Sequence, residues 1–394
     1  MTIGLRTDVL RPADSERAER VTYVELFFDL VFVFGLNQLA AYLAGNQTPL
    51  GAVEGAIMVC ALWWVWVSTT WVTNWLDPVR MPVRVAVIAF AFVAFVMSVA
   101  IGEAFGERAW TFALAYVALQ LGRAVLMVWA TARHDARVTH DFGNVLVWAL
   151  AGSVLWIVGA LLPTAFQLPF WAAALGLELV GSVRGYPVPG RGRVEIERWD
   201  VSGGHLAERS ALFVLIALGE GLLVTGFEFA GEEASADRVL AMVLAFVLAV
   251  ACWWIYFDHG ERIGSEALQA AGAPGRMARA AYSWVHLLIV GGIVLLGVGD
   301  KELLAHPHEQ SLGAVVTVLG GPALFLVGTL AFRRVLERRW MRAQLAGIGG
   351  ILVVAAMSPL LDPLGTGALA AVVLVATAVG ESLERMRRRA PSGG

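Results

Sequence analysis

Charged side chains are scarce in this chain. Asp, Glu, Lys and Arg make up only 15% of its 394 residues, whereas hydrophobic residues make up 58%. The mean hydropathy is accordingly high, at +0.69. A soluble protein of this length needs far more charge to cover its surface. The composition therefore excludes an ordinary soluble protein and indicates one that lies in a membrane.

Cysteine is also rare, and the usual catalytic signatures are missing. Cys60 and Cys252 both lie inside apolar runs, as expected of small buried hydrophobic residues rather than of a disulfide or a metal pair. We find no phosphate loop, dinucleotide fingerprint, HExxH motif or catalytic-triad spacing. The sequence therefore predicts no enzyme, no catalytic residues, no metal site and no cofactor.

Two loop sequences and two tryptophan pairs are weaker candidates for ligands. HDARVTHD at 134–141 and HPHE at 306–309 contain metal-ligating residue types, but polar loops of this kind are most often only solvated. The tryptophan pairs at 63–64 and 253–254 are more typical of packing or of interface anchors than of a ligand cage.

Long apolar stretches, by contrast, are abundant. A membrane-spanning helix needs about twenty predominantly apolar residues, and the alternation typical of a β-barrel is absent. We therefore predict an all-α, polytopic transmembrane bundle with about twelve spans. The predicted spans lie near 24–44, 51–76, 84–104, 109–130, 144–162, 167–183, 206–229, 236–257, 281–299, 312–332, 343–358 and 364–382.

The basic residues indicate an orientation for these spans. If the N-terminus is cytoplasmic, 25 of the 29 Lys and Arg residues fall in cytoplasmic segments. Only Arg108, Arg238 and Lys301 fall outside, and Arg123 lies within a span. This asymmetry follows the positive-inside rule. It predicts a multi-pass protein of the cytoplasmic membrane with both termini in the cytoplasm.

The longest polar insertion divides the chain into two halves of six spans each. The expected parts are a cytoplasmic N-terminal segment 1–23, a membrane half 24–183, a cytoplasmic linker 184–205, a second membrane half 206–382 and a basic tail 383–394. The halves resemble each other: ELFFDLVFVFGLNQ at 25–38 corresponds to ERSALFVLIALGEG at 208–221, and WWVW at 63–66 to WWIY at 253–256. This pattern favours an internal parallel repeat, as in some transporters.

Ionisable and polar residues inside the spans are costly and therefore mark candidate functional sites. We predict an ion, proton or solute pathway lined by Asp29, Asn37, Arg123, Glu178, Glu220 and His286. Depth along the helices, at about 1.5 Å per residue, matches Arg123 with Asp29 and Glu178. The alternative is that these residues form structural ion pairs that lock the helices together.

A second polar group lies at helix ends and consists of Glu25, His205, Glu208 and Arg209. Glu25 and Asp29 are four residues apart and share one helical face. Acidic side chains at a helix N-terminus also interact favourably with the helix dipole and cap free N–H groups. Capping is therefore the alternative interpretation for Glu25 and Glu208.

The partners expected from composition are lipids. The tail RMRRR at 385–389 and the basic cytoplasmic loops suit anionic lipid headgroups. Nucleic acid is not expected as a partner. The transported species, if the pathway carries one, is an unidentified ion or small solute.

Several segments resemble the bacterial low temperature requirement protein A (LtrA) family. They include VELFFDLVFVFGLNQLA at 24–40, WWVWVSTTWVTNWLDPVRMPVR at 63–84, AIGEAFGERAWTFALAYVALQLGR at 100–123, HLAERSALFVLIALGEGLL at 205–223, WWIYFD at 253–258 and AYSWVHLLIVGGIVLLGVG at 281–299. The resemblance implies a polytopic membrane protein linked with growth at low temperature. The matching polar residues are Glu25, Asp29, Asn74, Asp77, Glu103, Arg123, His205, Glu208, Arg209, Glu220 and His286.

The resemblance supplies no established substrate or catalytic residues. We expect a secondary transporter or channel for an ion, proton or small solute that uses the buried charges. The alternative is a membrane sensor or scaffold that supports growth at low temperature and has a purely structural polar core.

Overall fold

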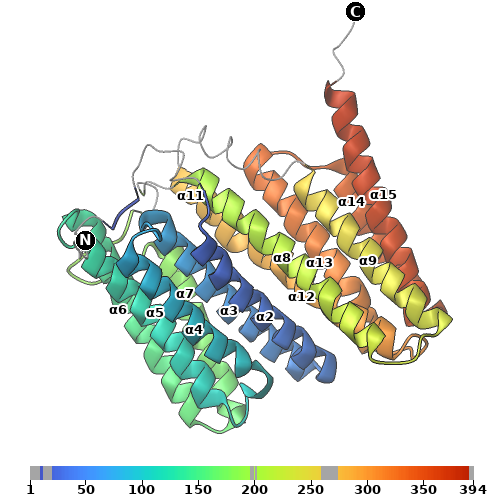
Figure 1. The fold of residues 1–394 in the computed structure, drawn as a ribbon, viewed down its shortest axis with the longest axis horizontal. Coiled ribbons are helices and arrows are strands. Elements are labelled where there is room, and N and C mark those ends of the chain that lie inside the picture. Colours follow the sequence, from blue (N-terminus) through green and yellow to red (C-terminus); the bar gives the residue numbers. More distant parts are fainter. Residues whose placement is uncertain (1–8, 12–19, 196–198, 200–201, 259–273, 390–394) are drawn as a thin grey trace, which may run out of the picture. The chain divides into compact units, whose positions relative to one another are not determined.

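A computed structural model describes residues 9–11, 20–195, 199, 202–258 and 274–389. Across these residues the structure is helical, with isolated β-bridges but no β-strand (Figure 1). Within the described ranges, twelve helices are long and apolar enough to cross a membrane. The predicted all-α class and the twelve spans are therefore confirmed, and the protein is an integral membrane protein.

The helices of the first half follow one another with short connections. They are α2 (Tyr23–Gly45), α3 (Pro49–Trp75), α4 (Met81–Val99), α5 (Ala109–Thr131), α6 (Ala136–Leu161) and α7 (Thr164–Arg184), with a 3₁₀ turn at Ile101–Glu103. Gly185 follows α7 and caps its C-terminus. Its φ of 75° lies in the left-handed region that glycine adopts readily.

The helices of the second half begin after the polar insertion. They are α8 (Gly203–Ala230), α9 (Ala236–Phe257), α11 (Pro274–Ala278), α12 (His286–Ala305), α13 (Leu312–Glu337), α14 (Arg342–Met357) and α15 (Pro363–Arg389), with a π-helical turn at Arg279–Val285 and a 3₁₀ turn at Ser358–Leu360. The π turn joins α11 to α12, so that the span runs from Gly275 to Ala305.

Several helices differ from the predicted spans because polar residues take part in their ends. Helix α6 begins eight residues before the predicted start, since the side chain of Asp135 accepts hydrogen bonds from the backbone N–H groups of Arg137 and Val138. Part of the predicted loop 134–141 is therefore helical. Helix α15 continues past 382 into the basic tail, and α4 ends at Val99, before the predicted 104.

The chain forms two compact units. The first comprises residues up to Tyr42, Pro49–Arg209 and Gly272–Ala278; the second comprises Leu43–Thr48, Ser210–Ala271 and Arg279 onward. Helix α8 thus contributes its first residues, through Arg209, to the first unit.

The two units pack their helices in a corresponding order. In the first unit α5 packs against α3, α4 and α6, and α7 packs against α3 and α6. In the second unit α13 packs against α9, α12 and α14, and α15 packs against α9 and α14. If the six helices of each half are numbered in chain order, every helix pair of the first unit named above has its counterpart in the second.

Helices α12 and α13 approach each other closely through glycine. A Cβ atom on Gly292 would lie 2.6 Å from the backbone nitrogen of Phe325, and one on Gly321 would lie 2.6 Å from that of Leu296. Membrane helices associate through such small residues because lipid offers no hydrophobic drive for helix pairing. The contact is therefore between backbones, and a side chain at either glycine would separate the helices.

Candidate functional site

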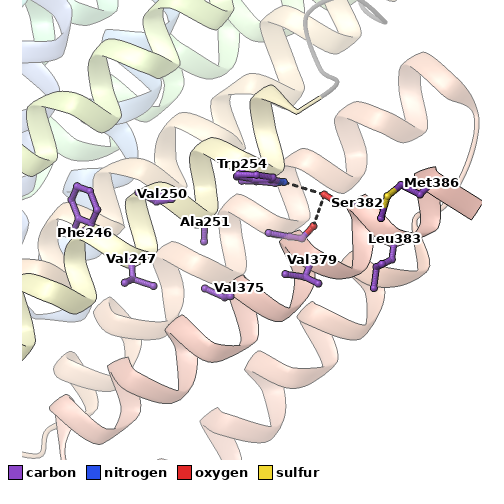
Figure 2. Close-up of a pocket in the computed structure, with 11 residues that line it drawn as sticks. Phe246, Val247, Val250, Ala251, Trp254, Val375, Val379, Ser382, Leu383 and Met386 are labelled. Carbon is purple, nitrogen blue, oxygen red and sulfur yellow. Dashed lines mark hydrogen bonds between the residues drawn. The ribbon is translucent and has the colours of Figure 1, made fainter.

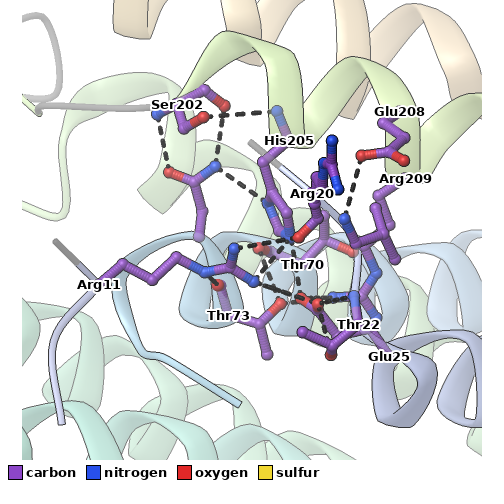
Figure 3. Close-up of polar contacts among 12 residues, drawn as sticks. Arg11, Arg20, Thr22, Glu25, Thr70, Thr73, Ser202, His205, Glu208 and Arg209 are labelled. Carbon is purple, nitrogen blue, oxygen red and sulfur yellow. Dashed lines mark hydrogen bonds and ion pairs between the residues drawn. The ribbon is translucent and has the colours of Figure 1, made fainter. Parts of the chain in front are cut away.

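A cluster of buried charges lies in the first unit, where α2, α3 and the first turns of α8 meet the segment 9–11 (Figure 3). We call it the charge cluster; its members are Arg11, Glu25, Asp29, His205 and Arg209. The last four are 0% exposed. Two carboxylates and two guanidinium groups balance one another, so that the cluster is neutral when His205 is neutral.

Glu25 holds both the start of α2 and the centre of the cluster. Its Oε2 accepts hydrogen bonds from the backbone N–H of Thr22 at 2.9 Å and from the Thr22 hydroxyl at 2.9 Å. The spacing Thr22-x-x-Glu25 is that of a capping box. Its Oε1 lies 2.9 Å from Nε2 of His205 and 3.4 Å from Nη1 of Arg209. Glu25 therefore caps its helix and also forms ion pairs.

Asp29 and Arg209 form the most enclosed ion pair of the cluster. Nη2 of Arg209 donates to Oδ1 of Asp29 at 2.9 Å and Nε approaches Oδ2 at 3.4 Å, so the pair is bidentate. The indole Nε1 of Trp66 donates to the same Oδ1 at 2.7 Å. The guanidinium also lies over the rings of Phe28 and Trp66, 5.6 and 5.7 Å from their centroids.

The two ring nitrogens of His205 face different partners. One of these partners, Asn74, is oriented by a backbone hydrogen bond. The backbone N–H of Ser202 donates to Oδ1 of Asn74 at 3.1 Å, which orients the Asn74 amide. Nδ2 of Asn74 is then the donor that faces Nδ1 of His205 at 3.2 Å. Nε2 lies 2.9 Å from Oε1 of Glu25, which favours a proton on this nitrogen, and 3.1 Å from Nη2 of Arg11, which can only donate. A second proton on Nδ1 would set two donors against each other.

Arg11 and Glu208 attach the segments on either side of residues 12–19 to the helices of the cluster. Nε of Arg11 donates to the carbonyl of Thr73 at 2.7 Å and its Nη2 lies 3.1 Å from Oε2 of Glu25. Arg11 thus lies at the C-terminal carbonyls of α3, where the helix dipole stabilises a cation, and joins them to Glu25 at the start of α2. Oε2 of Glu208 accepts from the backbone N–H of Val21 at 3.0 Å, just before α2.

A second polar centre of the first unit joins α3, α5 and α7. Nη1 of Arg123 donates to the backbone carbonyl of Val65 at 3.0 Å. On α7, Oε2 of Glu178 accepts a hydrogen bond of 2.7 Å from Tyr116 and another from Gln120. In the described part of the chain no carboxylate lies within 4 Å of the Arg123 guanidinium, and Oε1 of Glu178 has no hydrogen-bond partner. Arg123 and Glu178 are both only 5% exposed, so two buried ionisable side chains lie here without a direct ion pair between them.

The second unit contains an equivalent centre. Nη2 of Arg333 on α13 donates to the carbonyl of Ile255 at 2.9 Å and pairs with Oε2 of Glu381 on α15 at 3.0 Å. Val65 and Ile255 each follow a tryptophan pair directly. The helices involved are the second, fourth and sixth of their halves, as for Arg123 and Glu178. The arginine and the glutamate pair directly only in the second unit, where Arg333 also lies 3.7 Å from Glu337 and Glu381 lies 3.5 Å from Arg385. In both centres Oε1 of the glutamate has no hydrogen-bond partner among the described residues.

His286 lies at the start of α12, after the π-helical turn. Its Nδ1 donates to the carbonyl of Ala281 at 2.8 Å, so that Nε2 is free to accept from the Tyr256 hydroxyl at 2.8 Å. Phe332 packs against the imidazole, with ring centroids 4.7 Å apart. π-Helical turns often accompany functional sites, but here the imidazole is enclosed by aromatic rings.

The residues of the predicted pathway are distributed over both units. Asp29, Asn37, Arg123 and Glu178 belong to the first unit, and Glu220 and His286 to the second. Asn37 on α2 and Glu220 on α8 are half-buried. The predicted pair between Asp29 and Arg123 is wrong, since Asp29 binds Arg209. The two residues instead contact α3 at consecutive positions, Trp66 and Val65, which lie about 100° apart around a helix.

Several residues of both centres are missing from the sequence prediction. Arg11 falls in the predicted cytoplasmic N-terminal segment, Arg333 follows the predicted span 312–332, and Glu381 lies near the end of the predicted span 364–382. The tryptophan pairs are the sequence feature closest to this site. In each half, the residue that follows the pair supplies the carbonyl to which the arginine donates. Nothing in the sequence identifies Tyr116, Gln120 and Thr73 as partners.

The two loop sequences considered for metal binding form hydrogen bonds instead. Asp141 accepts from the indole N–H of Trp199 at 3.1 Å, and Asp135 caps α6. His308 lies between Asp362 and Asp237, with nitrogen–oxygen distances of 2.7 and 3.1 Å. Among the residues that the structure describes, no group of three or more His, Cys, Asp or Glu side chains is arranged to hold a metal ion.

Comparisons with known proteins place the chain among bacterial proteins. Residues 20–379 match the family described as bacterial low temperature requirement A protein (LtrA). The chain is 35% identical over 387 residues to the uncharacterized protein RA0937 of Rhizobium meliloti (strain 1021), covering 98% of this chain and 94% of that protein. No solved structure shows significant similarity to the chain.

Proposed function

The chain belongs to the bacterial low temperature requirement A (LtrA) family, and from that premise we propose that it is a secondary transporter or channel for a proton, ion or small solute. Its site is the centre formed by Arg123 and Glu178. In this proposal the protein is not an enzyme, lies in the cytoplasmic membrane and is built from two parallel repeats.

The observation that carries the proposal is the difference between the two equivalent centres. In the second unit Arg333 and Glu381 neutralise each other at 3.0 Å. In the first unit, Tyr116 and Gln120 occupy Oε2 of Glu178, and Arg123 is left with a backbone carbonyl. Incompletely paired charges within a membrane span are costly and are typical of ion and proton pathways.

The matching helix contacts and the matching arginine–carbonyl bonds support an internal repeat. Transporters built from such repeats place their binding sites within the membrane, near the interface of the helices. A duplicated centre whose arginine and glutamate pair directly in the second copy but not in the first fits one structural site and one working site.

Flux measurements in liposomes test the proposal. The purified protein is reconstituted around a trapped pH-sensitive dye, and a pH gradient or a potassium diffusion potential is imposed. We expect proton flux in the wild type and its loss in Glu178→Gln, since the amide keeps the shape but cannot exchange a proton. Glu381→Gln is the matched control and should retain flux. The absence of flux in the wild type under any imposed ion gradient, or unchanged flux in Glu178→Gln, would overturn the proposal.

A second candidate function is a membrane sensor or scaffold, favoured by the closed charge cluster. Glu25, Asp29, His205 and Arg209 are fully buried and satisfy one another. Such a cluster holds α2, α3 and α8 together without moving any ion. If this role is the correct one, Asp29→Asn and Glu178→Gln lower thermal stability, and the wild type shows no flux.

A further inference from the structure

An apolar groove runs along the outer surface of the second unit between α9 and α15. It has a volume of about 340 Å³ and is lined by Phe246, Val250, Trp254, Val375, Val379 and Leu383, among others. Figure 2 shows these side chains in a row from Phe246 at one end to Met386 at the other. Phe246, Trp254, Val379 and Leu383 are exposed, so the groove opens to whatever surrounds the protein.

The groove has one polar end. There the indole Nε1 of Trp254 donates to the Ser382 hydroxyl at 3.0 Å (Figure 2). Arg385 lies beside Ser382 and is neutralised by Asp258 and Glu381. Tryptophan prefers the interface between hydrocarbon and headgroups, which places this end of the groove at headgroup level.

One stripe of side chains on α15 continues from the groove to a basic residue, Arg387. Val375, Val379 and Leu383 line the groove at intervals of four residues, and Arg387 is the next position of the same stripe. Arg387 is exposed and, among the side chains that the structure describes, forms no ion pair. Its Cα lies about 6 Å beyond that of Leu383 along the helix axis.

We propose that the groove between α9 and α15 is a binding site for an anionic phospholipid, whose acyl chain lies along Phe246, Val250 and Val379 and whose phosphate contacts Arg387. In a bilayer the apolar lining alone does not select a lipid, because neighbouring acyl chains fill any such surface equally well. Selection comes from the guanidinium, whose N–H groups match phosphate oxygens in geometry and charge. The proposal is independent of whether the protein transports anything.

Native mass spectrometry of the detergent-purified protein tests the site. Phosphatidylglycerol, which is anionic, and phosphatidylcholine, which is zwitterionic, are added at equal concentrations, and the bound lipid is counted. We expect preferential retention of phosphatidylglycerol. Arg387→Gln should weaken this preference about fivefold, the effect of one basic residue at an anionic lipid surface. Arg339→Gln, which removes another exposed arginine of the same unit, is the matched control and should leave the preference unchanged.

A second pair of variants tests the acyl-chain part of the site. Val379→Trp fills the groove and should reduce retention of both lipids, whereas Val353→Trp, on an exposed position of α14 outside the groove, should have no effect. Equal retention of the two lipids by the wild type, or an unchanged preference in Arg387→Gln, would overturn the proposal. So would a dimer that Val379→Trp abolishes, because a second copy of the chain would then occupy the groove.

Discussion

Arg209 carries a positive charge where no solvent reaches it, and its surroundings show how that charge is tolerated. Asp29 binds it bidentately, Glu25 and Thr73 accept from Nη1, and two aromatic rings cover its faces. Removing one member of such a pair leaves the other buried and uncompensated. We therefore expect that removing one member of the cluster destabilises the protein strongly, although the intact cluster contributes little net stability.

We expect Arg209→Met to lower the free energy of unfolding by about 3–5 kcal/mol, because Asp29 is then left without its cation. The double variant Arg209→Met/Asp29→Leu should recover a large part of this loss, since both charges are absent. Denaturant unfolding in detergent micelles measures both effects. Arg339→Met, at an exposed position, is the control. Additive losses in the double variant would show that the pair is not coupled.

The stability of the second unit is expected to depend on pH through His308. Hydrogen bonds to Asp362 and Asp237 raise the pKa of His308 above its ordinary 6.5. The stabilisation from its proton is therefore complete below pH 6.5 and is lost as the pH rises through the raised pKa. The pKa of Asp362 is lowered from 3.8 by the backbone N–H of Gly365 and by His308, so that its contribution is lost only in stronger acid.

We therefore expect the difference in thermal midpoint between wild type and His308→Gln to shrink as the pH is raised from weakly acidic to alkaline. The comparison is made by thermal unfolding in detergent at several pH values. His306→Gln serves as the control, because His306 forms a longer ion pair, at 3.5 Å, with Glu309 of its own loop on the exposed surface. A difference independent of pH would contradict the bridging role of His308.

The sequence identifies single residues of the charge cluster better than their partners. Thr22 and Glu25 form a capping box that can be recognised from spacing alone. Asp29 and Arg209 are 180 residues apart in the chain, and depth in the membrane fixes a side chain along one direction only. Arg123 and Arg209 are both within reach of Asp29 in that direction, so the choice between them requires the lateral arrangement of α3, α5 and α8.

Among the helices, α12 and α13 make the contact most sensitive to side-chain size. We expect Gly321→Ala to lower the free energy of unfolding by about 1–3 kcal/mol, because the new Cβ would meet the backbone of Leu296. Gly349→Ala on α14 is the matched control: a Cβ there has open space, and alanine is the better helix former. Unfolding in detergent measures both, and equal effects would show that α12 and α13 can separate at little cost.

The number of helices follows from hydropathy, and their ends do not. A span of about twenty apolar residues is recognisable because the hydrocarbon core sets its length. Helix α6 extends into a polar sequence because Asp135 caps it, and α15 extends into basic residues because Arg385 pairs with Asp258 and Glu381. Helix ends are therefore determined by local hydrogen bonds and ion pairs, which hydropathy does not register.

For the whole molecule, the repeat inferred from two sequence segments gains support from contacts that the segments do not contain. The offset between the halves is 183 residues for Glu25 and Glu208 and 190 for the tryptophan pairs. The difference of seven residues is about two helical turns, so a single offset does not align both segments. The helix contacts and the arginine–carbonyl bonds correspond nonetheless, because packing order tolerates such insertions.

For each unit separately, the positive-inside rule predicts that the basic ends of its helices lie in the cytoplasm. In a variant without Cys60 and Cys252, single cysteines are placed at Glu107 and Arg133 for the first unit and at Glu309 and Arg339 for the second. Each pair brackets helices of one unit, and all four positions are exposed. A membrane-impermeant thiol reagent added to intact cells should label the cysteines at 107 and 309 and spare those at 133 and 339 until the cells are opened, because arginine-rich ends remain inside. Labelling of 133 or of 339 in intact cells would contradict the predicted orientation of the unit that carries it.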